Sequence, residues 1–145
     1  MAHVLLERML SARGADGRIR VRSGGIAPYA RDGMLASLDA RLVLREIGID
    51  LGETTFTSTD LKRHPELIAQ ADLILTMTAA QRDKLAEFPE AAGRALLTLR
   101  EFAGEPGDIE DPVLQGEAAF RACRDEIQRA LEVGLARLLA GGGER

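Results

Sequence analysis

The hydrophobic pattern of this chain centres on one short apolar run, residues 71–78. Polar residues close the run at Asp72 and Thr78, and the flanking segments have the spacing of amphipathic helices. A short run that is apolar on both faces is typical of a strand buried between two layers of helices, whereas a buried helix would need a longer run. Strands that alternate with helices predict a parallel sheet, in which functional side chains lie at the carboxyl ends of the strands.

Apolar residues at helical spacing predict most of the remaining elements. The predicted helices span residues 2–13, 35–47, 61–70, 79–88 and 117–140. Gly48 is expected to end the second helix, and Ser58 or Thr59 can cap the third, which Pro65 can divide. In the last helix, one apolar face is expected to pack inward through Phe120, Ile127, Leu131, Leu135 and Leu138.

Two further segments have the pattern of strands. Residues 18–22 alternate between polar and apolar, which predicts a strand with one buried face near an edge of the sheet. Ser23-Gly24-Gly25 would follow it as a flexible loop. Residues 95–99 form another apolar run. The predicted fold is therefore α/β, with a short parallel sheet between two layers of helices.

Composition narrows the class of protein. The 145 residues fit one domain, residues 1–145, with a single core. The net charge of −4 gives no reason to expect a nucleic-acid or membrane partner. A single cysteine cannot form an internal disulfide, which favours a cytoplasmic location. One cysteine and two histidines do not provide the usual metal-ligand spacings, so no metal or other cofactor is expected.

An acidic loop, residues 107–112, lies between the last predicted strand and the last helix, which places it at the carboxyl edge of the sheet. Pro112 holds the preceding residue, Asp111, in an extended conformation. A carboxylic acid held in this way can donate a proton to a leaving-group oxygen. The alternative is a solvated acidic turn whose charges favour the start of the next helix, and from the residues alone this alternative is preferred.

Other polar residues carry weaker signals. Cys123 and Arg129 have the C-x5-R spacing of cysteine-dependent phosphatases, but the residues between them favour a helix and include no glycine. Their N–H groups would be committed to helical hydrogen bonds, so we reject this match as a phosphate site. Ser23-Gly24-Gly25 could bind an anion, although a plain turn is favoured. His3 is expected on the exposed side of the first helix, and His64 is expected in solvent.

Several motifs in the same order resemble the low-molecular-weight protein tyrosine phosphatase family. Residues 1–10 are similar to the helix after the family's phosphate loop, and Ser23-Gly24-Gly25 is similar to its Ser-Ala-Gly turn. Residues 48–50 match its Gly-Ile-Asp, and residues 72–77 match its Asp-x-Ile-Leu-x-Met strand. Residues 109–112, followed by Phe120, match its acid loop and last helix. The resemblance covers essentially the whole chain.

The resemblance implies a three-layer α/β/α fold and a hydrolase that uses no cofactor. In this family a cysteine thiolate attacks phosphotyrosine and forms a phosphocysteine, while an aspartate protonates the leaving oxygen. By this resemblance Asp111 is the general acid, and Ser23 supports the phosphate loop. The implied partner is a phosphotyrosine protein or a small phosphomonoester.

The chain also departs from the family's pattern. The first central strand and the C-x5-R-Ser/Thr-Pro loop are expected just before Met1 and are absent from these residues, so the chain is expected to be N-terminally truncated relative to the family. In the family that strand lies between those predicted here at residues 18–22 and 71–78. Thr78 stands where the family usually has aspartate, and Val113 and Leu114 stand where aromatic residues usually help to bind the tyrosine ring.

These departures predict that the chain as written is inactive, and three interpretations stay open. The first is a phosphatase whose product starts upstream. The second is a catalytically dead regulatory or phospho-ligand-binding module of the same fold. The third is an unrelated α/β domain, such as a flavodoxin-like or receiver domain, which the motifs do not support. Without a central strand, a homo-oligomer or a poorly stable chain is expected, because strand edges would be left unpaired.

Overall fold

The structure is a computed structural model that describes residues 1–51 and 57–142. Its elements follow one another as α1 (Ala2–Ala12), α2 (Leu38–Arg45), α3 (Glu66–Ala69), β1 (Leu73–Thr76), α4 (Ala79–Ala86), the 3-10 turn η1 (Pro89–Ala91), β2 (Ala95–Thr98), α5 (Leu99–Phe102) and α6 (Glu117–Gly142). Within these described residues, no helix is both long and apolar enough to cross a lipid bilayer.

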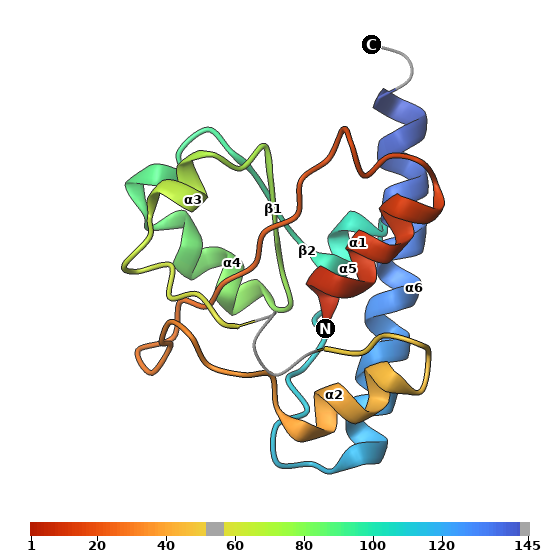
Figure 1. The fold of residues 1–145 in the computed structure, drawn as a ribbon. Helices are drawn as coiled ribbons and strands as arrows, with labels where there is room; N and C mark the ends of the chain where they lie inside the picture. The colour runs from red at the N-terminus through yellow and green to blue at the C-terminus, as the bar shows by residue number, and fades with distance from the viewer. Residues whose placement is uncertain (52–56, 143–145) are drawn as a thin grey trace.

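A short parallel sheet lies between two groups of helices (Figure 1). In the described part of the chain, the sheet consists of β1 and β2, with Leu73 opposite Ala95 and Thr76 opposite Thr98. Helix α4 makes the crossover between the two strands. The helices α3 and α4 lie on one side of the sheet, and α1, α5 and α6 lie on the other (Figure 1). The predicted α/β class and short parallel sheet are confirmed.

Alternate residues of β1 face the two layers of helices. Leu75 packs in the cluster that contains Ile127 and Leu131 of α6, whereas Ile74 packs against Ile68 and Leu85 of α3 and α4. Complete burial of a leucine or isoleucine side chain stabilises a fold by about 1.5–3 kcal/mol. The central run is therefore a strand that is covered on both faces, as its pattern predicts.

Local capping residues set several helix boundaries. The Ser37 side chain accepts a hydrogen bond from the Ala40 N–H at 3.3 Å, so α2 begins at Leu38 rather than at the predicted residue 35. Leu35 instead forms an isolated antiparallel bridge with Thr57. Gly48 follows the helix with φ +85°, a conformation that glycine adopts without strain.

The predicted strand at residues 18–22 is wrong. These residues form a turn and then irregular backbone, and the bridge that follows joins Gly25 to Asp60. The alternation still predicts burial correctly, since Ile19 and Val21 pack against the cluster of Leu10 and Leu135. A strand also needs a hydrogen-bonded neighbour, and side-chain alternation carries no information about whether one exists.

The predicted helix at residues 61–70 is shorter than expected. Pro65 immediately precedes α3, because proline is accepted just before the first turn and disrupts a helix interior. Ser58 caps no helix, since its Oγ accepts from the Met34 N–H at 3.0 Å and donates to the Arg31 carbonyl. On α6, the predicted apolar face is buried except at Leu138, which is 41% exposed near the end of the helix.

Candidate functional site

The acidic loop before α6 is fastened to the carboxyl end of β1. The Ile109 N–H donates to the Met77 carbonyl at 2.9 Å, one residue beyond the strand. The Ile109 side chain is buried in the main hydrophobic core. Because Asp111 follows two residues later, the structure places it beyond this edge of the sheet, where the sequence predicts functional side chains.

Asp111 is held in a tight turn at the surface. Its Oδ1 accepts a hydrogen bond from the Val113 N–H at 3.1 Å, and its carbonyl accepts from Gln115 Nε2 at 3.3 Å. The side chain is exposed. Within the described residues the structure records no hydrogen-bond partner for Asp111 Oδ2.

The three carboxylates of the loop have different surroundings. Asp108 Oδ1 accepts from the Ala79 N–H at the start of α4, at 2.8 Å. Asp108 and Glu110 both line a hollow of about 440 Å³, together with the ion pair of Arg82 and Glu101. Burial raises the pKa of the Cys123 thiol in α6, and the charge of Asp111 raises it further. The Asp108 side chain is thus bonded to α4, whereas the Asp111 side chain is bonded within its own turn, a difference that the sequence alone does not show.

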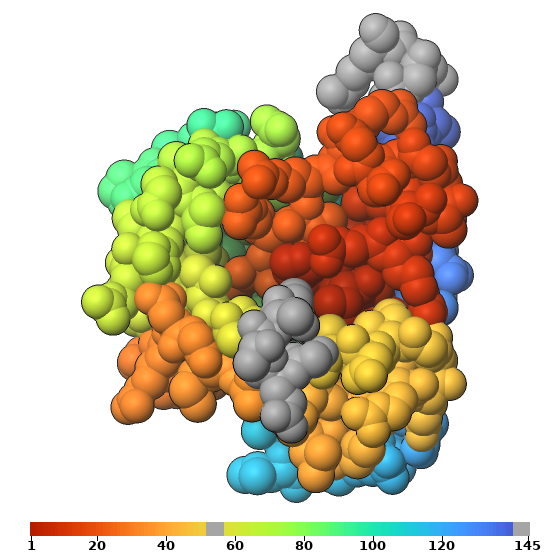
Figure 2. Space-filling model, viewed as in Figure 1, coloured from red at the N-terminus to blue at the C-terminus, as the bar shows by residue number. Residues whose placement is uncertain are grey.

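The start of α1 lies in the same neighbourhood as Asp111. The amino group of Met1 lowers the pKa of the Cys123 thiol, so it lies within electrostatic range of the group that Asp111 also influences. Figure 2 shows α1 and α2 on one face of the molecule. A helix N-terminus carries partial positive charge, so the start of α1 favours an anion nearby.

Cys123 and Arg129 do not form a phosphate site. Cys123 is buried in α6, and its Sγ lies 3.8 Å from the Glu110 carbonyl. Its pKa is raised, whereas a nucleophilic cysteine needs a lowered one. Arg129 pairs with Glu126 at 2.8 Å and also with Glu105. Both side chains are committed to other contacts, which agrees with the rejection of this spacing.

Ser23 lies beside the first turn of α1. Its Oγ is 2.7 Å from His3 Nδ1, and His3 Nε2 is 3.0 Å from Glu7. The expectation that His3 is exposed is wrong, because its side chain is 16% exposed and burial lowers its pKa. The helical pattern gave no sign of this contact, since the partner comes from an irregular segment. His64 is partly exposed, and its pKa is raised mainly by the hydrogen bond to Asp32.

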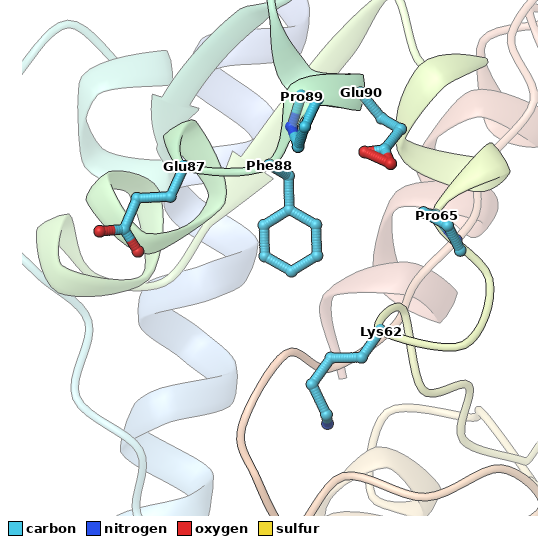
Figure 3. Close-up of a pocket in the computed structure, with 6 residues that line it drawn as sticks. All are labelled: Lys62, Pro65, Glu87, Phe88, Pro89 and Glu90. Atoms are coloured by element: carbon cyan, nitrogen blue, oxygen red, sulfur yellow. The ribbon is translucent and has the colours of Figure 1, made fainter.

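A second hollow lies away from these residues, beside α3, α4 and η1. It measures about 340 Å³ and is lined by Lys62, Pro65, Glu87, Phe88, Pro89 and Glu90. Figure 3 shows the Phe88 ring between Lys62 on one side and Pro89 on the other. Lys62 Nζ is already paired with Asp60 at 2.9 Å. Among the described residues, no group of three or more acidic, histidine or cysteine side chains could hold a metal ion.

Comparison with known sequences identifies related phosphatases. A profile of the family described as "Low molecular weight phosphotyrosine protein phosphatase" matches residues 1–141. A protein-arginine-phosphatase of Geobacillus stearothermophilus is 37% identical over 116 residues, covering 79% of this chain and 73% of that protein. A probable low molecular weight protein-tyrosine-phosphatase, EpsP of Ralstonia nicotianae, is 30% identical over 142 residues, covering 98% of this chain and 88% of that protein.

Solved structures show the same fold. The YwlE arginine phosphatase from Geobacillus stearothermophilus superposes with a TM-score of 0.81 at 32% identity, covering 99% of this chain and 89% of that one. A low molecular weight protein tyrosine phosphatase from Bacillus subtilis gives a TM-score of 0.77 at 29% identity, covering 97% and 87% of the two chains.

Proposed function

Because this chain belongs to the low molecular weight phosphotyrosine protein phosphatase family, we propose that it serves the removal of a phosphoryl group from phosphorylated proteins. The observation that supports this function is the position of Asp111. Its carboxyl is fixed by the Val113 N–H at the carboxyl edge of the sheet, on the side of α6 that meets the start of α1. There an acid can reach the leaving oxygen of a phosphate that is bound near the helix N-terminus.

In the proposed reaction, a thiolate attacks phosphorus while the bond from phosphorus to the leaving atom breaks. That atom is oxygen in phosphotyrosine and nitrogen in phosphoarginine. Asp111 gives its proton to that atom, so the leaving group departs without a negative charge. In the second step the Asp111 carboxylate takes a proton from water as the water oxygen attacks the phosphorus of the phosphocysteine. The bond from phosphorus to sulfur breaks, which releases inorganic phosphate and regenerates the thiolate. Ser23, held by His3 beside the first turn of α1, supports the backbone that surrounds the phosphate.

We further propose that residues 1–145 alone do not catalyse this reaction. Cys123 is the single cysteine of the sequence, and its burial in α6 disfavours the thiolate. Hydrolysis would therefore need a thiolate and a set of inward-pointing N–H groups that these residues do not supply.

The group that is dephosphorylated has two candidates, phosphotyrosine and phosphoarginine. Phosphoarginine is favoured by the side chains next to the acid, because Val113 and Leu114 are 57% and 97% exposed and neither offers an aromatic ring to a tyrosyl group. The relative with 37% identity is a protein-arginine-phosphatase, which agrees with this second candidate. Phosphotyrosine remains the substrate that the family's name suggests.

A chimaera tests the proposal. A segment that carries the family's first strand and C-x5-R-Ser/Thr-Pro loop is joined to Met1, and the chimaera and the unmodified chain are assayed on p-nitrophenyl phosphate, a phosphotyrosine peptide and a phosphoarginine peptide. We expect no turnover by the unmodified chain and turnover by the chimaera. A folded chimaera without turnover on all three substrates contradicts the phosphatase proposal, and turnover by the chain that Cys123→Ser abolishes contradicts our interpretation of α6.

A second variant tests the acid. In the chimaera, Asp111→Asn should lower kcat by about 10²–10⁴-fold, the usual effect of losing a general acid. The loss should be greater for phenyl phosphate than for p-nitrophenyl phosphate, because a poorer leaving group depends more on protonation. Glu110→Gln is the matched control, since Glu110 lines the hollow beside Arg82 and Glu101, which Asp111 does not line, and it should leave kcat nearly unchanged. Equal losses on both substrates would remove Asp111 from this role.

The catalytically dead, phospho-ligand-binding alternative makes a different prediction. The unmodified chain would then bind phosphate or a phosphopeptide without turnover, with amide shifts in nuclear magnetic resonance spectra at the start of α1 and around Asp111. Self-association also remains a proposal, because the edge strand β1 has one recorded strand partner in the described chain. Sedimentation velocity over a range of concentrations distinguishes a monomer from an oligomer.

A further inference from the structure

The direction of the loop that carries Asp111 is set by a residue three positions earlier. The Asp108 side chain accepts a hydrogen bond from the Ala79 N–H at 2.8 Å, and the Asp108 carbonyl accepts from Arg100 Nε at 3.0 Å. Arg100 also pairs with Glu126 of α6 at 3.0 Å. One residue of the loop is thus fastened to α4 through its side chain and to α5 and α6 through its backbone.

We propose that Asp108 is the positioning residue for Asp111: its contact with the first turn of α4 sets where the Asp111 carboxyl lies relative to α6 and the start of α1. The catalytic significance of this contact rests on the function proposed above, whereas its structural effect does not. Nothing in the sequence distinguishes Asp108 from its acidic neighbours, because the partner N–H lies 29 residues earlier in the chain.

The contact satisfies a donor that α4 cannot satisfy internally. The first N–H groups of a helix have no intrahelical acceptor. Thr78 Oγ1 accepts from the Gln81 N–H at 3.2 Å, so the Ala79 N–H is left for Asp108. A carboxylate is also favoured at the positive end of a helix. Both effects stabilise the observed position of the loop.

The neighbouring anchor keeps the loop folded when the Asp108 side chain is removed. Ile109 remains buried, and its N–H still donates to the Met77 carbonyl. Asp108→Ala should therefore change the direction of the loop without unfolding the protein. Asp108→Asn is the matched variant, because an amide oxygen can still accept from the Ala79 N–H, and asparagine and aspartate are comparable at helix N-termini.

Cys123 provides a probe of the position of Asp111 that needs no catalysis. It is the single cysteine in the sequence, and its thiol lies within range of the Asp111 charge. The other charges that influence it, the Met1 amino group and Glu126, are the same in every variant. The pKa of the thiol is measured on the full 145-residue chain by ¹³C nuclear magnetic resonance of Cys123 Cβ, with circular dichroism to establish that each variant is folded.

We expect Asp111→Asn to lower the pKa of the Cys123 thiol, Asp108→Ala to lower it in the same direction, and Asp108→Asn to retain the value of the unmodified chain. In an Asp111→Asn background, Asp108→Ala should have no further effect. A double-variant comparison of this kind isolates the coupling between the two residues. An additional decrease in that background would show that Asp108 acts by covering Cys123 rather than by placing Asp111, and would overturn the proposal.

An unchanged thiol pKa in folded Asp108→Ala would overturn it as well. The chimaera adds a catalytic measurement: Asp108→Ala should lower kcat more for phenyl phosphate than for p-nitrophenyl phosphate, with rescue by Asp108→Asn. If the chimaera proves inactive while the thiol measurements follow the expected pattern, the phosphatase proposal fails and the positioning role of Asp108 stands. If the chimaera is active but the thiol pKa does not follow the expected pattern, the phosphatase proposal stands and the positioning role of Asp108 fails.

Discussion

The buried guanidinium of Arg124 joins α6 to the end of α2, and its removal should destabilise the fold measurably. The Arg124 side chain is 8% exposed. Its Nη1 donates to the Val43 carbonyl at 2.7 Å and to Glu46 Oε1 at 2.8 Å. Val43 lies in the last turn of α2, where carbonyl groups lack intrahelical partners. Arg124 therefore supplies a donor that the helix itself cannot.

The cost of Arg124→Ala follows from the groups that it leaves behind. A buried carbonyl without a partner costs about 1–3 kcal/mol. The lost packing of the aliphatic stem adds roughly 1 kcal/mol. We leave the interaction with Glu46 out of this total, because Glu46 keeps Arg121 as a partner at 2.6 Å. The free energy of unfolding should fall by about 2–4 kcal/mol, a large part of the 5–15 kcal/mol that is typical of a domain.

Urea denaturation followed by circular dichroism measures this change, with Arg121→Ala as the matched control. Arg121 contacts the same glutamate, but its side chain is 40% exposed and makes a surface ion pair, which contributes little to stability. The midpoint should fall clearly for Arg124→Ala and much less for Arg121→Ala, with similar slopes. Equal effects of the two substitutions would refute the reasoning, since burial of the Val43 contact would then have no consequence.

Three further predictions concern stability. The pKa of Glu46 is lowered from 4.5 to about 2, chiefly by hydrogen bonds to Arg121. Its stabilising effect is therefore present above pH 4.5 and is lost as the pH falls toward 2. When the melting temperature is measured against pH, Glu46→Gln should reduce its decrease at acid pH. The pKa of His64 is raised above 6.5, chiefly by the hydrogen bond to Asp32. Its contribution to stability is therefore complete below pH 6.5 and is lost as the pH rises through the pKa of His64 in the folded protein. Nuclear magnetic resonance titration of His64, with unfolding of His64→Gln at several pH values, tests this. A Cβ at Gly134 would lie 2.1 Å from Phe102 Cδ2, so Gly134→Ala should destabilise the protein by about 1–3 kcal/mol in urea although alanine is the better helix former.

The central strand and the long last helix could be predicted because burial alone determines their patterns. The run at residues 71–78 is apolar on both faces, and the structure covers β1 with helices on both faces. In α6 the buried positions Phe120, Ile127, Leu131 and Leu135 repeat at helical spacing. Both patterns record which side chains leave water, and this term dominates the folding free energy.

The errors arise where a partner distant in sequence decides the outcome. The apolar residues among 18–22 are packed against the core as their alternation predicts, but these residues lack a hydrogen-bonded neighbouring strand in the described chain. The prediction of burial is therefore confirmed, and the prediction of a strand is wrong. Ser58 has the chemistry of a helix cap, yet its hydroxyl bonds to the Arg31 carbonyl. His3 fits an exposed helical position, yet Ser23 covers it. Periodicity describes one element at a time and gives no information about such contacts.

The acidic loop combines both situations. Its place at the edge of the sheet follows from the order of elements, which the sequence gives directly. The roles of its carboxylates depend on which N–H groups are unsatisfied nearby, at Ala79 for Asp108 and at Val113 for Asp111. Each of these N–H groups lacks a backbone acceptor within its own turn or helix. It donates instead to the carboxylate that the fold places at hydrogen-bond distance. Asp108 caps α4 and thereby determines the position of Asp111. A substitution that breaks this cap should therefore also weaken the proton transfer by Asp111.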